Sequence, residues 1–149
     1  MVNIHPPTPH HKPGWLKLWQ GYLEFYECDL PEDISDFTWE RFFDPGEPVF
    51  CLGAYEGECM IGFVTYVLRR STWSEFHYCY LEDIFVDPSH RGRGVGRKLI
   101  SAVKESAQKL GCTRLYWMTH EKNATAQGLY NKLADKSGFI QYRMSLENE

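Results

Sequence analysis

The segment Leu81–Gly96 (LEDIFVDPSHRGRGVG) contains residue types and a spacing that suit a phosphate-binding site. Its apolar residues predict a buried strand, which the Asp-Pro pair ends because proline lacks a backbone N–H donor. Three glycines, at positions 92, 94 and 96, then lead directly into an amphipathic helical pattern. Such a turn presents unpaired backbone N–H groups and the positive end of the helix dipole, so the segment predicts an anion site.

The glycine spacing separates this loop from two common phosphate loops. The dinucleotide fingerprint G-x-G-x-x-G would need a third glycine where Arg97 stands, and no register supplies the P-loop G-x-x-x-x-G-K-[ST]. Arg91, Gly94 and Gly96 instead match R/Q-x-x-G-x-G/A, so the segment resembles the acetyl-CoA signature of the GCN5-related N-acetyltransferases (GNAT). An ordinary glycine-rich turn is the alternative. The resemblance implies that acetyl-CoA contacts the strand end and the loop at Ile84, Phe85, Val86, Arg91, Gly92, Arg93, Gly94, Val95 and Gly96.

A second motif, Asn123–Tyr130 (NATAQGLY), resembles the N-x-x-A-x-x-L/F-Y element of the same family. Asn123 and Tyr130 are seven positions apart, so they share one face of the predicted helix and could serve one extended ligand. The resemblance implies that Asn123 contacts the pantetheine arm and that the Tyr130 hydroxyl protonates the departing thiolate of coenzyme A. The alternative is a helix N-cap and a half-buried tyrosine.

Acetyl transfer to an amine requires a neutral amine, and Glu82 is the candidate that takes its proton, directly or through a water. An alkylammonium with a pKa near the lysine value of about 10.4 is mostly protonated at neutral pH. A carboxylate on a central strand is costly unless it is paired or functional, although a structural hydrogen bond is the alternative. Strict alternation would place Asp83 on the opposite face of the strand. The backbone N–H groups of Ile84 and Val86 are candidate oxyanion donors.

A strongly aromatic helix is predicted after Pro13, with an apolar stripe that is most simply explained by core packing. Its far end is the candidate wall of an amine-binding cavity, because aromatic faces attract cations. The predicted substrate residues are Tyr22, Tyr26, Asp29, Trp73, Glu82 and Asp83.

Two further resemblances narrow the range of expected substrates. Residues 80–86 (YLEDIFV) are similar to the segment that precedes the loop in diamine and polyamine (spermidine/spermine-type) acetyltransferases. The wider layout resembles a fungal subgroup of histone and polyamine acetyltransferases. The likenesses imply an N-acetyltransferase that acts on a small basic primary amine. A protein lysine or an amino acid as acceptor, or a catalytically idle acetyl-CoA-binding module, are the alternatives.

Composition restricts the remaining function classes. A net charge of −4 argues against a general nucleic-acid binder, and an apolar run of membrane-spanning length is absent from the sequence. Five cysteines without CxxC spacing predict reduced thiols in a cytoplasmic protein. The adjacent His10 and His11 lack the spacing typical of a metal site, so no metal is expected. The expected assembly is a homodimer.

The order of predicted elements is β-α-α-β-β-β-α-β-α-β. This order predicts a mixed sheet with helices on both faces. The resemblance implies a single GNAT-like α/β domain over residues 1–149, with a mostly antiparallel central sheet. The last strand is predicted over Phe139–Leu146, where apolar and polar residues alternate.

Overall fold

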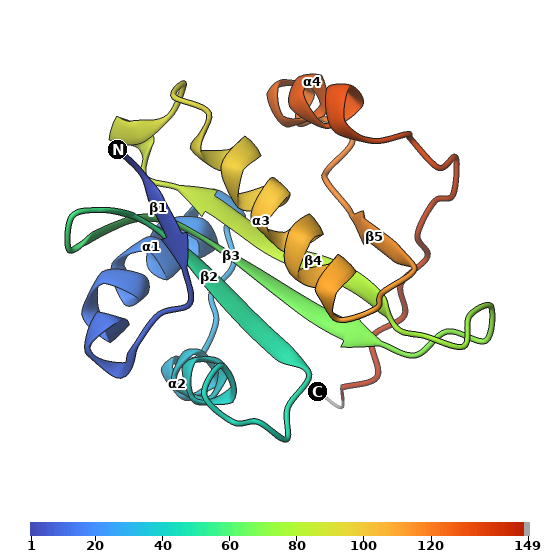
Figure 1. The fold of residues 1–149 in the computed structure, drawn as a ribbon, viewed down its shortest axis with the longest axis horizontal. Coiled ribbons are helices and arrows are strands. Elements are labelled where there is room, and N and C mark those ends of the chain that lie inside the picture. The colour runs from blue at the N-terminus through green and yellow to red at the C-terminus, as the bar shows by residue number, and fades with distance from the viewer. Residues whose placement is uncertain (148–149) are drawn as a thin grey trace. The chain divides into compact units, whose positions relative to one another are not determined.

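A five-stranded sheet organises the computed structural model, which describes residues 1–147 (Figure 1). The strands lie side by side in chain order: β1 (Asn3–His5), β2 (Val49–Glu56), β3 (Cys59–Arg69), β4 (Tyr78–Val86) and β5 (Arg114–Trp117). The first four are antiparallel neighbours, and β5 runs parallel to β4. The predicted mixed, mostly antiparallel sheet is confirmed.

The chain divides into two compact units, Met1–Met118 and Thr119–Glu149. The first contains the whole sheet and the helices α1 (Lys12–Phe25), α2 (Glu32–Arg41) and α3 (Val95–Lys109). It also contains two short 3-10 turns, Pro9–His11 and Pro88–His90. The second unit contains α4 (Ala124–Leu133). That residues 1–149 form a single domain stays a prediction.

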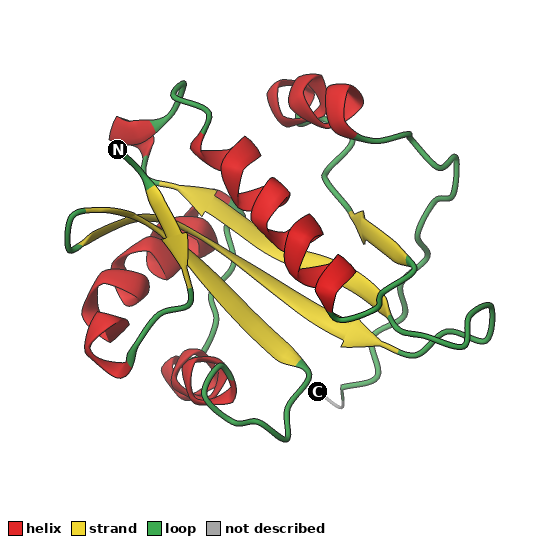
Figure 2. Ribbon diagram, in the orientation of Figure 1, coloured by secondary structure: helices red, strands yellow, loops and turns green. Residues whose placement is uncertain are grey.

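Helices α1 and α2 cover one face of the sheet and α3 covers the other (Figures 1 and 2). The predicted aromatic stripe of α1 is buried at Trp15 and Trp19, whereas Phe25 and Tyr26 at its far end are exposed. The buried residues of α3 recur every three or four positions, as an amphipathic helix requires. No helix within the described residues has the length and apolar character needed to cross a membrane.

The predicted closing strand over Phe139–Leu146 is wrong, because residues 138–147 form neither strand nor helix. Alternating apolar residues create a face that could be buried, but a strand also needs a neighbour to pair with its backbone groups. In residues 1–147 no strand pairs with this segment. Its large apolar side chains are exposed instead: Phe139, Ile140, Tyr142, Met144 and Leu146.

Candidate active site

The loop between β4 and α3 has the backbone shape that its glycines predict. Gly92 and Gly94 have φ values of +81° and +78°, which side-chain-bearing residues rarely adopt. Gly94 is the N-cap of α3, and its carbonyl accepts the hydrogen bond of the Lys98 N–H at 3.1 Å. The three N–H groups between these two residues therefore precede the helical ladder and are available to an anion at the positive end of the helix.

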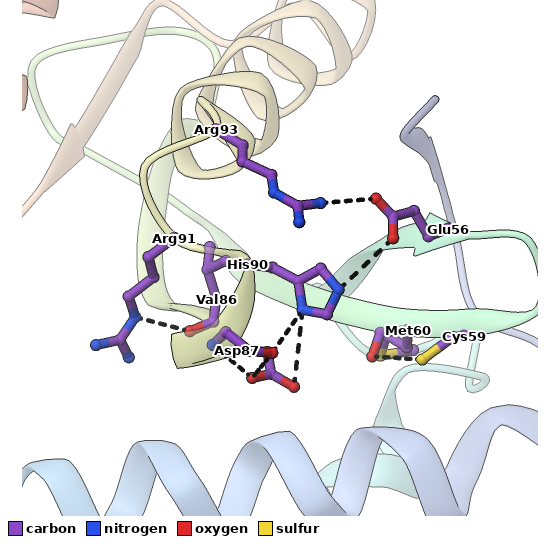
Figure 3. A network of polar contacts seen from close by, with 9 residues as sticks. Glu56, Cys59, Met60, Val86, Asp87, His90, Arg91 and Arg93 are labelled. Atoms are coloured by element: carbon purple, nitrogen blue, oxygen red, sulfur yellow. Dashed lines mark hydrogen bonds and ion pairs between the residues drawn. The ribbon is translucent and has the colours of Figure 1, made fainter.

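The arginine side chains of this loop form hydrogen bonds with other groups of the protein (Figure 3). Arg91 Nε donates to the Val86 carbonyl at 2.9 Å, and Arg93 Nη1 donates to Glu56 Oε2 at 3.1 Å. The other carboxylate oxygen of Glu56 lies 3.6 Å from His90 Nε2. The loop is thus anchored to the end of β2, and the groups that it offers to a ligand are mainly backbone N–H groups.

The carboxyl end of β4 has an edge that β5 does not cover. Within the described residues, the pairing of β4 with β5 ends at Leu81, whereas β4 continues to Val86. The Asp87 N–H bonds to the Ile61 carbonyl at 2.8 Å, on the β3 side. Because backbone groups alternate along a strand, the N–H groups of Ile84 and Val86 point to the other side, which β5 leaves uncovered.

Glu82 occupies a β-bulge in β4. Thr65 of β3 pairs with Asp83, and the next residue of β3 pairs with Leu81, so Glu82 is the extra residue. A bulge bends its strand and redirects the side chains. The alternation that predicted opposite faces for Glu82 and Asp83 is therefore broken, and both carboxylates act electrostatically on the Tyr22 hydroxyl of α1.

Asp83 is held by two hydroxyl groups. Its carboxylate accepts hydrogen bonds from Thr65 Oγ1 and from the Tyr22 hydroxyl. Burial raises the pKa of Asp83, while the two hydrogen bonds act in the opposite direction because they stabilise the charged form. Burial, followed by the Asp83 charge, also raises the pKa of Tyr22, so this hydroxyl remains a donor.

Glu82, in contrast, is exposed to solvent while its pKa is raised above the ordinary carboxyl value. The largest cause is the partial loss of hydration, and the neighbouring Asp83 adds to it. Arg41 of α2 lowers the same pKa. An accessible carboxylate whose pKa lies closer to neutrality is suited to exchange a proton with a ligand.

The remaining predicted substrate residues fall into two groups. The ring of Tyr26 lies 5.0 Å from that of Tyr22, so the structure places Tyr26 next to the carboxylates. Trp73 is 75% exposed in the turn between β3 and β4, beyond the pair Arg69–Tyr78 at the far end of these strands. Asp29 lies in the exposed segment between α1 and α2. Tyr22, Tyr26, Glu82 and Asp83 thus form a group that does not include Trp73.

Asn123 and Tyr130 lie in the second unit, at the start and near the end of α4. Asn123 caps the helix, because its Oδ1 accepts the Ala126 N–H at 3.3 Å. Tyr130 is half-buried. The capping role and the half-burial agree with the structural alternative, and a role for both residues in binding or catalysis stays a prediction.

Sequence reasoning did not single out Thr65, Arg41 or Glu56. Thr65 is a buried polar residue inside the apolar strand β3, and that local contrast is a signal that could have been used. Arg41 and Glu56 carry no such signal, since their positions beside the site depend on how α2 and β2 pack. Only the tertiary structure brings them to Glu82 and to the glycine loop.

One group in the N-terminal region could hold a metal ion, although the sequence predicts none. His10, His11 and Glu58 offer ligand atoms that all lie within 4.8 Å of one another. The Thr8 N–H donates to His11 Nδ1 at 2.9 Å, which leaves the proton of the neutral imidazole on Nε2. That arrangement opposes coordination by His11, so the group is a weak candidate.

Comparison of the sequence with models of protein families identifies the family of this chain. The model of the acetyltransferase (GNAT) family matches residues 14–134, which is most of the chain. The chain belongs to the GNAT acetyltransferase family. It is similar to the D-amino-acid N-acetyltransferase HPA3 of Saccharomyces cerevisiae, with 34% identity over 96% of this chain and 92% of that protein. Its identity to the thialysine N-epsilon-acetyltransferase of Bos taurus is 36%, over 76% of this chain and 57% of that protein.

Solved structures agree on the fold of this GNAT chain. A probable acetyltransferase superposes with a TM-score of 0.85 at 23% identity, covering 99% of each chain. The aminoglycoside acetyltransferase AAC(6')-Iy, in complex with a bisubstrate analogue, superposes with a TM-score of 0.82 at 23% identity, covering 97% of this chain and 99% of that one. At such identities the likeness concerns the fold alone.

Membership of the GNAT family makes the protein an N-acetyltransferase that uses acetyl-CoA. The residues of the first unit fit that cofactor. The N-terminus of α3 offers backbone donors for a pyrophosphate, and the uncovered edge of β4 begins directly before the same loop. A Cβ built on Gly92 or Gly94 would meet no protein atom within 4 Å, so space for a ligand lies next to the loop backbone.

Proposed function

We propose that this enzyme acetylates a primary amine of a small basic molecule and that Glu82 accepts the amine proton. The observation that carries this proposal is the position of Glu82. It is an exposed carboxylate with a raised pKa, placed by a bulge in the strand that leads into the glycine loop. Acetyl-CoA, when bound, supplies the acetyl group as an activated thioester. The reaction then needs a base near the amine and hydrogen-bond donors near the acetyl oxygen.

Three further roles complete the proposal. The N–H groups of Ile84 and Val86 donate to the negative charge that develops on the acetyl oxygen, because they point to the uncovered edge of β4. The backbone of the loop from Arg91 to Gly96 holds the pyrophosphate. Asn123 and Tyr130 of α4 contact the pantetheine arm and protonate the leaving thiolate, a role supported by their match to the family motif.

Two substrate classes fit a small basic amine. A diamine or polyamine is supported by the segment YLEDIFV and by the aromatic rings of Tyr22 and Tyr26 beside the carboxylates. An amino acid is supported by the relatives, whose names specify D-amino acids, thialysine and, in Arabidopsis thaliana, L-ornithine. A protein lysine as acceptor is the runner-up among larger substrates.

The decisive experiment is a screen of amines with acetyl-CoA, in which the release of free thiol gives the rate and mass spectrometry identifies the product. Amino acids, diamines, polyamines and a lysine-containing peptide form the panel. We expect turnover with at least one small amine and a loss of turnover in Glu82→Gln at neutral pH. If no amine is acetylated while acetyl-CoA still binds, the chain is an idle acetyl-CoA-binding module.

The cellular location and the assembly are further proposals. We propose that the enzyme works in the cytoplasm as a homodimer. The cytoplasm is supported by the five free cysteines. The dimer is supported by the large apolar side chains that are exposed within residues 139–146, because a subunit contact would remove such side chains from water. Size-exclusion chromatography with light scattering would show a monomer if the second proposal is wrong.

A further inference from the structure

Glu56, the last residue of β2, places a carboxylate beside the anion site of the glycine loop. Its Oε2 accepts a hydrogen bond from Arg93 Nη1 at 3.1 Å, and its Oε1 lies 3.6 Å from His90 Nε2 (Figure 3). Both partners belong to the segment between β4 and α3, which also offers the backbone N–H groups for a pyrophosphate. A negative charge at this place repels a phosphate, so by electrostatics alone Glu56 would weaken coenzyme binding. Its two contacts with the loop point to a role that outweighs this repulsion.

The strand that carries Glu56 gives these contacts a fixed base. The backbone of Glu56 pairs with Cys59 of β3 across the two-residue turn of residues 57–58. The side chains of Glu56 and His90 are 37% and 22% exposed, so their contact is partly shielded from solvent, whereas Arg93 is 55% exposed. Partly shielded charges are screened less by salt than fully exposed ones. Glu56 thus holds two loop side chains from a strand whose own position is set by sheet pairing.

The two contacts of Glu56 lie on either side of Gly92. His90 precedes the pair Arg91-Gly92, and Arg93 follows it. Gly92 has a φ of +81°, and a glycine has more backbone freedom to lose than any other residue. When one carboxylate holds the side chains of residues 90 and 93, it restricts the conformations of the two residues between them. Less conformational entropy is then lost when a ligand binds to the loop.

The other side of the loop is held by β4 itself. Arg91 Nε donates to the Val86 carbonyl at 2.9 Å, and the Arg91 guanidinium lies 5.1 Å from the centroid of the Phe85 ring. This attachment is local in the chain, because its partners directly precede the loop. Glu56 instead comes from a strand more than thirty positions earlier, so it links the loop to a different part of the sheet.

We propose that Glu56 is a positioning residue for coenzyme binding. By holding His90 and Arg93, it keeps the backbone N–H groups of the glycine loop in the arrangement that receives the pyrophosphate. The inference concerns the cofactor loop, so it does not depend on which amine is accepted or on the proposed role of Glu82. Its consequence has a definite sign. Removal of this negative charge should weaken the binding of an anion, whereas charge repulsion alone would predict stronger binding.

Calorimetric titration of coenzyme A into Glu56→Gln tests this sign. We expect the Kd to rise by roughly threefold to tenfold, because the ion pairs that order the loop are lost. The KM for acetyl-CoA should rise by a similar factor while kcat stays nearly unchanged. Glu58→Gln is the matched control. It removes the same charge two positions away, from an exposed side chain that forms no ion pair with the loop within residues 1–147. Its Kd should remain at or slightly below the wild-type value.

Two further measurements separate positioning from a simple charge effect. In an Arg93→Met background, Glu56→Gln should change the Kd less than it does in the wild type, because one of the two contacts is already absent. Limited digestion with trypsin in the absence of ligand reports on the loop directly. Cleavage after Arg91 should be faster in Glu56→Gln than in the wild type and in Glu58→Gln, because a loop that opens more often is cleaved more often.

The outcomes that would overturn the inference are specific. An unchanged or lower Kd in Glu56→Gln would mean that Glu56 acts on the ligand only as a repelling charge. Equal losses of affinity in Glu56→Gln and Glu58→Gln would assign the effect to the overall charge or to the fold. If circular dichroism shows that Glu56→Gln does not fold, the test moves to the loop. Arg93→Met should then weaken coenzyme A binding and Arg93→Lys, which keeps the ion pair, should retain most of it. Equal affinity in these two variants would also overturn the inference.

Discussion

The glycine loop and the carboxylate pair lie at the end and in the middle of the same strand, and they are built by different means. The loop offers backbone N–H groups whose direction is set by two glycines with positive φ, and its arginines are bound to Val86 and Glu56. The pair offers side chains whose properties are set by Tyr22 and Thr65 from other elements. A backbone site is therefore determined locally, whereas a side-chain site is determined by packing.

The same contrast appears within the pair. The Asp83 carboxylate accepts hydrogen bonds from two hydroxyl groups. Glu82 is exposed, and its pKa is set mainly by a partial loss of hydration and by the charges of Asp83 and Arg41. One carboxylate is thus held by hydrogen bonds within the protein, and the other remains accessible. Substitutions that remove one function at a time can test whether this division holds.

The largest effect is expected for Glu82→Gln. If Glu82 takes the amine proton, kcat should fall by roughly a hundredfold to ten-thousandfold at neutral pH, with part of the loss recovered at higher pH, where more free amine is present. Acetyl-CoA binding should change little. Steady-state kinetics against amine concentration at several pH values provide the measurement. A raised KM with an unchanged kcat would make Glu82 an anchor for the substrate cation.

Tyr130→Phe tests whether α4 contributes a catalytic group in addition to the glycine loop and the carboxylate pair. The hydroxyl alone is removed, so coenzyme A binding should be retained while turnover falls by about tenfold to ten-thousandfold, the range for loss of a general acid. Thiol release and calorimetry are the two measurements. Wild-type turnover would assign Tyr130 a structural role and leave the chemistry to the first unit.

Gly94→Val tests the backbone site. A β-branched residue is strained at φ +78°, and its side chain would enter the space beside the loop backbone, so coenzyme A binding should weaken by at least about tenfold. Gly111→Val is a matched control, because Gly111 has φ +79° and equally open surroundings at the other end of α3. Calorimetry should show a loss in the first variant only. Equal losses in both would mean that strain, and not the binding site, is responsible.

Asp83→Asn tests how the pair sets the pH dependence. The Asp83 charge raises the pKa of Glu82, so its removal should lower that pKa and move the acid limb of kcat/KM to lower pH, by about one unit or less. A base is active when deprotonated, so the variant should retain more of its activity in weak acid. The pH–rate profile provides the measurement. An acid limb that does not move would separate the titration of Glu82 from Asp83.

Thr65→Val is expected to have the smallest effect. It removes one hydroxyl donor to the Asp83 carboxylate at nearly constant volume, which should reduce the free energy of unfolding by about 1–3 kcal/mol. Urea denaturation provides the measurement, with Thr72→Val in the exposed β3–β4 turn as the control. Wild-type stability in Thr65→Val would show that this hydrogen bond does not contribute to the free energy of unfolding.

Much of the fold could be predicted because its signals are local. The apolar run that ends at the Asp-Pro pair predicted the strand β4, and the helical pattern directly after the glycines predicted α3. The segment Phe139–Leu146 shows the limit of the same reasoning, since alternation describes a face but supplies no partner strand. The bulge at Glu82 shows it again, because a bulge depends on the register between two strands.

The sequence by itself determined the glycine loop, the family and the identity of the proposed base. Glycine conformation and helix N-termini depend on a few consecutive residues, so a short motif carries them. The tertiary structure alone decided that Glu82 and Asp83 act on one hydroxyl, that Thr65 and Tyr22 hold Asp83, and that Arg41 lowers the pKa of Glu82. Burial and neighbouring charges set these properties, and both arise only when segments that are distant in the chain pack together.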